Sequence, residues 1–275
     1  MTRSSDIRRA LLAFAGLLVS AVVLPGPTSA QLAGLPGIVL ASPEDDQVRA
    51  SPRWRERLVA LFLEGVTRDE DKRERGVMRW AGPVEISLRG AGSLPHVAFV
   101  QELAAELAGL TGLPVTVSTD QRRVAAIDVY VASVASYWPP FLRAANPAER
   151  ERVFTCAAAP SVASGVIRRS TVRINAGALT PETVRACLVE EIVQSMGLFG
   201  EVAEPRGTIL NDTVGYQGLG VVDRLLLRTL YDPRLTPGMS GAAARPVVDA
   251  ILGEQLGHLV CRDAAQGAAR RCRLL

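Results

Sequence analysis

Two adjacent carboxylates and an amide stand on one predicted helix, at Glu190, Glu191 and Gln194. At 3.6 residues per turn these side chains share one arc of the helix, while aliphatic side chains fill the other. If that arc lines a cleft, mutual repulsion and partial loss of water would raise the pKa of one carboxyl and suit it to general acid or base catalysis. If it does not, the acids form an ordinary solvated face, which the periodicity alone favours.

The same residues have the spacing of a zinc-protease helix, His-Glu-x-x-His-x-x-Gly, with both histidines replaced. The chain has two histidines, His96 and His258, and neither has a partner at ligand spacing. A histidine-based zinc site is therefore excluded, and we expect no metal and no cofactor. A calcium or magnesium ion held by Glu190, Asp212 and carbonyl oxygens remains chemically possible.

The motif helix is expected within Thr180–Gly200, with Thr180 as its cap, Pro181 in its first turn and Gly197 closing its last turn. Alternating or apolar runs before it predict strands, and a helical stripe predicts one long helix between the first two. The arginines of the fourth strand need solvent, which favours a sheet edge. The predicted strands are Pro83–Arg89, Leu113–Ser118, Ala126–Ala132 and Gly165–Asn175, and the helix is His96–Leu110.

The first 30 residues have the features of a signal peptide, with cleavage near Ala30. The apolar run Leu11–Leu24 is too short for a stable membrane span. Removing residues 1–30, which carry three arginines and one aspartate, lowers the formal net charge from +3 to +1. No basic run is interleaved with aromatics, so nucleic-acid binding is not supported. The sequence predicts a periplasmic or secreted protein.

Four cysteines follow the predicted leader: Cys156, Cys187, Cys261 and Cys272. Export would permit disulfides, and four cysteines allow three pairings. We favour Cys156 with Cys187, which ties a loop to the motif helix, and Cys261 with Cys272, which closes a short polar tail. A zinc site built from cysteine is disfavoured because the sequence has no C-x-x-C pair.

A set of short motifs is spread from Met78 to Leu252, and the most specific are the Glu-Glu-x-x-Gln helix and a turn reading Tyr-Asp-Pro-Arg-Leu before Pro-Gly-Met. The motifs are Met78-Arg79-Trp80, Pro83–Leu88, Pro95-His96-Val97, Cys187–Leu198, Asn211-Asp212, Asp223 and Tyr231–Met239. Together they resemble the bacterial domain-of-unknown-function 2927 family. That family has no established activity, so the resemblance implies export and a shared fold. It also makes Asn211, Asp212 and Tyr231 candidate binding residues.

The motif helix and the order of the elements before it are also similar to the catalytic half of zincins. On this resemblance Glu190 and Gln194 stand at the first two zinc ligands, Glu191 at the general base and Gly200 at a third histidine. It implies an α+β fold, with a zincin-like mixed sheet, covering helices and a C-terminal helical part. Fold-level likeness alone says little about function.

These inferences divide the chain into a signal peptide at 1–30, a partly helical extension at 31–77, a zincin-like domain at 78–253 and a cysteine-bracketed tail at 254–275. The preferred hypothesis is a zinc-less binding protein of the cell envelope. It would hold a peptide or envelope component beside Glu190, Glu191 and Gln194, along the strand Gly165–Asn175. The alternatives are a peptidase-like hydrolase with Glu191 as general base, and a structural envelope protein. Oligomeric state is not predicted.

Overall fold

The structure is a computed structural model that describes residues 51–68, 72–120, 122–132, 156–177, 179–202, 208–211, 216–262 and 271–274, with no side chains beyond residue 258. The predicted signal peptide and Asp212 lie outside the described residues. Within the described part, no helix is both long and apolar enough to cross a bilayer.

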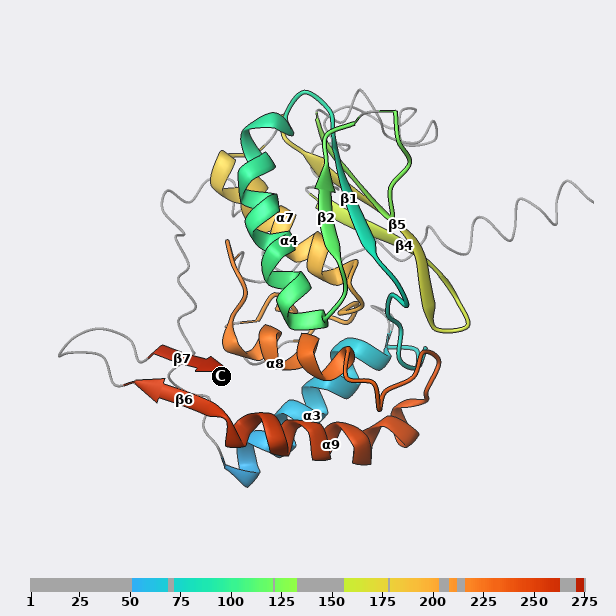
Figure 1. Cartoon of the computed structure of the whole chain (residues 1–275), viewed down its shortest axis with the longest axis vertical. Coiled ribbons are helices and arrows are strands. Elements are labelled where there is room, and N and C mark those ends of the chain that lie inside the picture. Colours follow the sequence, from blue (N-terminus) through green and yellow to red (C-terminus); the bar gives the residue numbers. More distant parts are fainter. Residues whose placement is uncertain are drawn as a thin grey trace, which may run out of the picture.

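A five-stranded mixed sheet forms the centre of the molecule (Figure 1), with the strand order β2-β1-β3-β5-β4. Four strands run parallel, and β4 pairs with β5 in the antiparallel direction. The predicted strands are all present, within two residues of their expected ends. The strands are β1 Val84–Arg89, β2 Val115–Ser118, β3 Ile127–Ala132, β4 Cys156–Ala163 and β5 Val166–Asn175.

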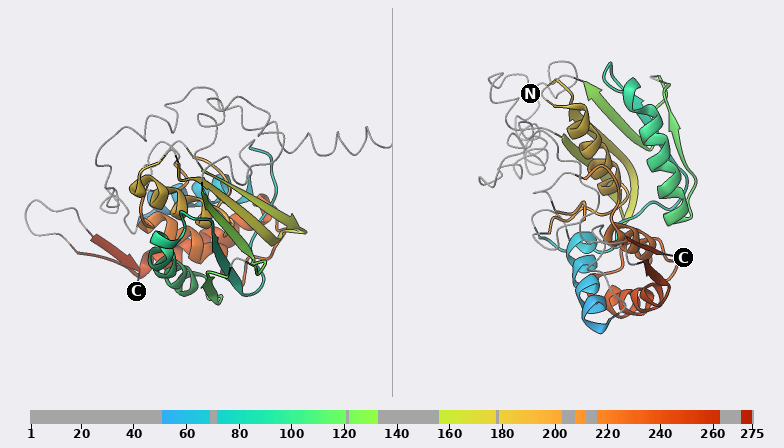
Figure 2. Two further views of the ribbon diagram at one scale, coloured as in Figure 1. Left: turned by 90° about the horizontal axis from the view of Figure 1, so that it is seen from above. Right: turned by 90° about the vertical axis from the view of Figure 1, so that its left-hand side faces the viewer.

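Helices α4 (Val97–Thr111) and α7 (Pro181–Gln194) lie on the same face of the sheet. Beyond one end of the sheet, α3 (Pro52–Thr67), α8 (Val221–Leu230) and α9 (Gly241–Gly257) pack together (Figure 2). One hydrophobic core joins the sheet and these helices. The expected α+β class and the C-terminal helical part are therefore confirmed.

The expectation that Gly165–Asn175 is an edge strand is wrong. The strand β5 lies between β3 and β4, and its arginines reach solvent on the outer face of the sheet, the face away from α4 and α7. The true edge, β4, was not predicted because its sequence, CAAAPSVA, is dominated by small residues and holds a proline.

Pro160 faces the open side of β4. Its partner in the register is Ser170, which donates its N–H to the Ala126 carbonyl at 2.8 Å, on the β3 side of β5. Pro160 and Ser170 are therefore a non-hydrogen-bonded pair, and the main-chain groups of Pro160 point away from β5. Because proline has no N–H, the open edge lacks one donor there.

Regular structure also forms on either side of the predicted central domain. Helix α3 belongs to the core, since Leu58 and Phe62 are fully buried against it. Its capping residue, Ser51, accepts a hydrogen bond from the Trp54 N–H at 3.3 Å. In the tail, β6 (Leu259–Arg262) pairs with β7 (Arg271–Leu274) and puts Cys261 opposite Cys272. The side chains of that pair lie outside the described residues.

Asp223 fixes the start of α8. Its buried carboxylate accepts hydrogen bonds from the Gly220 N–H at 2.8 Å, the Ile209 N–H at 3.0 Å and the Thr208 hydroxyl at 2.6 Å. Burial raises the pKa of Asp223 to about 6, and these three donors limit the rise. The carboxylate thus joins α8 to the turn at Thr208–Leu210.

Asp223 should make stability depend on pH. A folded-state pKa above the ordinary value of 3.8 means that the native protein binds the proton more tightly than the unfolded chain. Its stabilising contribution is complete below pH 3.8 and is lost as pH rises through about 6. Relative to Asp223→Asn, the wild type should lose roughly 3 kcal/mol of unfolding free energy across that window. Denaturant unfolding at a series of pH values measures the difference, and a pH-independent difference would contradict the argument.

Candidate functional site

The motif helix α7 begins as expected. The Thr180 hydroxyl accepts a hydrogen bond from the Thr183 N–H at 3.3 Å, and Pro181 occupies the first turn with Glu182. Gly197, three residues after the helix, has a φ of +117°, which a residue with a side chain rarely adopts. A Cβ at this position would also collide with the Met78 carbonyl.

The polar arc of α7 is not a solvated face. Glu191 is 4% exposed and Cys187 is also 4% exposed, while Glu190 and Gln194 are half-buried. Strand β4 lies over that arc, so both sides of the helix are covered. The periodicity alone could not show this cover because no strand was predicted at Cys156–Ala163.

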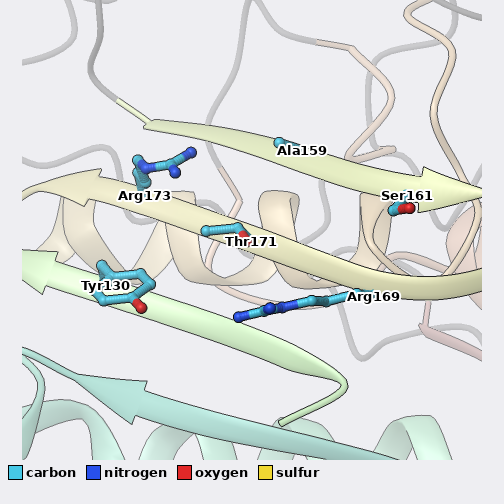
Figure 3. Close-up of a pocket in the computed structure, with 6 residues that line it drawn as sticks. All are labelled: Tyr130, Ala159, Ser161, Arg169, Thr171 and Arg173. Carbon is cyan, nitrogen blue, oxygen red and sulfur yellow. The ribbon is translucent and has the colours of Figure 1, made fainter. Parts of the chain in front are cut away.

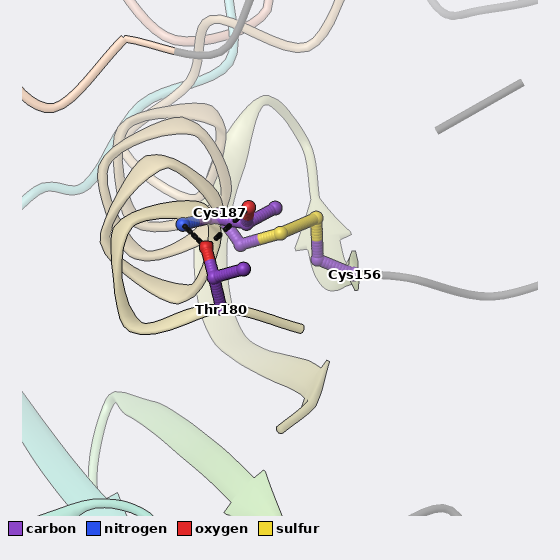
Figure 4. The surroundings of a disulfide bond; sticks show 4 residues. Cys156, Thr180 and Cys187 are labelled. Atoms are coloured by element: carbon purple, nitrogen blue, oxygen red, sulfur yellow. Dashed lines mark hydrogen bonds between the residues drawn. A yellow bond between two sulfur atoms is a disulfide. The ribbon is translucent and has the colours of Figure 1, made fainter. Parts of the chain in front are cut away.

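A disulfide between Cys156 and Cys187 joins the first residue of β4 to the middle of α7 (Figure 4). This is the pairing that the sequence analysis favours for these two cysteines. One carboxylate oxygen of Glu190, one of Glu191 and the Cys156 sulfur all lie within 4.8 Å of one another. The acidic pair therefore stands beside the covalent link between helix and edge strand.

The donor set at this place does not fit a zinc site. Within the described residues, Cys156, Glu190 and Glu191 are the one group of three that could hold a metal ion, and the Cys156 sulfur is already bonded to Cys187. Cysteine binds zinc as a thiolate, which a disulfide sulfur is not, and no histidine belongs to the group. Two carboxylates alone would suit a hard cation, and a cluster of acids without further oxygen ligands is a weak site for one.

The two residues that follow α7, Ser195 and Met196, are buried, and their carbonyls have side-chain partners. The indole N–H of Trp80 donates to the Ser195 carbonyl at 2.8 Å, and the Tyr231 hydroxyl donates to the Met196 carbonyl, also at 2.8 Å. The Trp80 backbone N–H in turn donates to the Tyr231 hydroxyl at 3.3 Å. Burial raises the pKa of Tyr231 well above its usual range, so the phenol keeps the proton that it donates.

The same helix end is tied to the sheet by two serines. The Ser195 hydroxyl lies 2.7 Å from the hydroxyl of Ser170 on β5, and both side chains are buried. Their contact fixes the distance between α7 and the sheet at this end, while the disulfide fixes it nearer the helix start.

Arg79 ties the first motif to the turn after α8. Its guanidinium donates to the Leu230 carbonyl at 3.0 Å and the Asp232 carbonyl at 3.1 Å, and it lies 5.7 Å from the centre of the Tyr231 ring. Burial lowers the pKa of Arg79, and the charge of Asp232 opposes that effect. The Met-Arg-Trp and Tyr-Asp-Pro segments, distant in sequence, therefore meet at the end of α7.

The sequence-predicted binding residues do not converge on one cleft in the described part. Tyr231 is a buried hydrogen-bonding partner of α7, and Asn211 is 1% exposed in the turn beside Asp223. Asp212 lies outside the described residues. Glu190, Glu191 and Gln194 do stay together on α7.

Sequence reasoning missed a charged cluster on the outer face of the sheet. The Asp128 carboxylate, which is fully buried, pairs with Arg89 of β1 at 2.7 Å and Arg169 of β5 at 2.6 Å. A charged residue inside the apolar strand IDVYVA was the available signal, because a buried carboxylate needs a cationic partner.

These features define an α+β protein in which a buried helix is held to a mixed sheet by a disulfide and by hydrogen bonds at its end. The chain belongs to a family described as protein of unknown function, DUF2927, which matches residues 55–250. The match begins within α3 and thus earlier than Met78, where the motifs begin. Comparison with curated proteins and with solved structures gave no match.

Removing the Tyr231 hydroxyl should weaken the fold. In Tyr231→Phe the Met196 carbonyl and the Trp80 N–H both lose a partner in a buried place, so the unfolding free energy should fall by about 1–3 kcal/mol. Urea unfolding measures this loss. Tyr130→Phe, on the outer face, is the matched control with the smaller expected effect, and equal losses in the two variants would contradict the assignment.

Removing the disulfide should release the edge strand from α7. The Cys156→Ala/Cys187→Ala double variant should lose about 2–4 kcal/mol of unfolding free energy, because the link closes a loop with a sequence separation of 31 residues. A dithiol reductant should destabilise the wild type more than the double variant, which keeps only Cys261 and Cys272. If the reductant weakened both equally, the stabilising link would lie elsewhere.

Proposed function

We propose that this chain is an exported protein of the cell envelope that binds a ligand without cleaving it, on a zincin-like frame that has lost its zinc site. Export is supported by the leader features of residues 1–30 and by the disulfide, which is typical of oxidising compartments. The frame is supported by the element order, β1, α4, β2 and β3, then β4 and β5, then α7.

The burial of Glu191 is the observation that favours ligand binding over hydrolysis as the function. This residue stands at the general-base position of the motif, and a general base must reach both water and substrate. Its side chain is 4% exposed and lies next to the disulfide-linked start of β4. Glu190 and Gln194 replace the two histidines, so no Lewis acid would activate the water. A buried carboxylate without zinc is poorly suited to peptide hydrolysis.

The ligand that this arrangement favours is an extended peptide segment with a basic side chain. In the described part of the chain, β4 is the edge strand nearest to α7, and its main chain could pair with a partner strand near Ala158. Cys156 and Ala158 alternate with Ala157 and point to the α7 side, where Glu190 and Gln194 are half-buried. A lysine or arginine of the ligand would meet negative charge there. Pro160 would confine the pairing to the first half of the strand.

The test uses the mature protein and an extended peptide that carries one lysine, with binding measured by calorimetry. Glu190→Gln should weaken binding about tenfold, because it removes the charge that faces the lysine. Glu182→Gln, on the exposed first turn of α7, is the matched control and should leave affinity unchanged. Mass spectrometry of the exported protein should find the new N-terminus after Ala30.

Two outcomes would select the other hypotheses. If the wild type cleaves the peptide and Glu191→Gln abolishes cleavage, the protein is a hydrolase with Glu191 as its base. If it neither binds nor cleaves any extended peptide, a structural role in the envelope is favoured. Stoichiometric zinc in the purified protein would overturn the argument from the donor set.

A further inference from the structure

The outer face of the sheet, opposite α7, contains a hollow of about 420 Å³ (Figure 3). Its volume lies in the lower part of the range for small-molecule sites. The residues that line it come from three neighbouring strands. They are Tyr130 of β3, Ala159 and Ser161 of β4, and Arg169, Thr171 and Arg173 of β5.

The hollow exists because small residues stand opposite large ones. In the antiparallel register, Ala157 pairs with Arg173, Ala159 with Thr171, and Ser161 with Arg169. The small side chains of β4 leave space above the edge strand, and the long arginines of β5 border it. A run of small residues, which hid β4 from sequence analysis, thus shapes a site.

Two guanidinium groups are held in place by one carboxylate. Arg89 donates to one oxygen of Asp128 from both Nε and Nη2, at 2.8 Å and 2.7 Å. Arg169 donates to the other oxygen at 2.6 Å. The Arg169 side chain is still 48% exposed, so part of its five N–H donors remain available to a ligand. The ion pairs fix the orientation of Arg169 before any ligand arrives, which lowers the entropic cost of binding.

Arg173 adds a positive charge without a carboxylate partner in the described part of the chain. It stands opposite Tyr130 in the β3–β5 register, with Thr171 as its neighbour on the same face. In Figure 3 Arg169 extends along β5 toward Tyr130, and Thr171 lies between the two arginines. The charged residues that line the hollow, Arg169 and Arg173, are both positive.

We propose that this hollow binds a compact organic dianion, a dicarboxylate or a phosphate monoester, through Arg169 and Arg173. Guanidinium groups match the planar or tetrahedral oxygens of carboxylate and phosphate with paired N–H donors. The hydroxyls of Thr171 and Ser161 supply further hydrogen bonds to the ligand. The site uses the face of the sheet that α7 does not occupy, so it is independent of the proposed peptide binding.

The experiment measures binding of succinate and of glycerol phosphate to the mature protein by calorimetry at low ionic strength. At least one of the two should bind, and the affinity should fall as salt rises. Their uncharged counterparts, succinamide and glycerol, should not bind. Succinate alone would identify a carboxylate site, and glycerol phosphate alone a phosphoryl site. If neither dianion binds, the proposal is wrong, while the peptide test at α7 is unaffected.

Variants decide whether the binding occurs in the hollow. Arg173→Gln should weaken binding at least tenfold, and Arg173→Lys should recover part of the loss because it keeps the charge and loses the paired donors. Arg168→Gln is the matched control. Arg168 is an exposed arginine of the same strand, located at the register shift between β4 and β5, and it does not line the hollow. Equal losses in Arg173→Gln and Arg168→Gln would mean general attraction to positive charge and would overturn the proposal.

Discussion

A helix that ends inside a protein must find partners for its last carbonyls, and this constraint organises the structure around α7. The backbone N–H groups of residues 195–197 satisfy the last carbonyls of α7. Trp80 and Tyr231 donate to the buried carbonyls of Ser195 and Met196 that follow, and Gly197 lets the chain turn where no side chain would fit. Arg79 then fixes the turn that holds Tyr231. The segments most specific to the family therefore satisfy a buried helix end. They do not by themselves specify a reaction.

Much of the fold follows from local sequence patterns. The cap at Thr180, the glycine at 197 and the alternation of the inner strands each have a local physical cause, and each element was predicted. Strand β4 was not, because a run of small residues with a proline carries no periodic signal. Because β4 was not predicted, neither the burial of Glu191 nor the internal position of β5 could be predicted. Both depend on β4, which packs beside α7 and β5 in the folded protein.

The two candidate sites also differ in how far the sequence could predict them. The pair Glu190 and Glu191 was visible in the sequence because it lies on a helix with the spacing of a zinc-protease motif. The outer-face cluster was not, because Arg89, Asp128 and Arg169 come from three strands and meet only through the strand register. The acidic pair lies on the α7 side of the sheet, and the ion-paired Arg89 and Arg169 lie on the other side.

Pro160 limits how copies of this protein can associate through the edge of β4. An exposed strand edge is a template on which another chain can add, and then another, until a stack of strands grows. An unprotected edge next to a sheet of this size would favour such growth. The missing N–H at Pro160 interrupts the template halfway along β4 and therefore opposes pairing with a long, continuous strand.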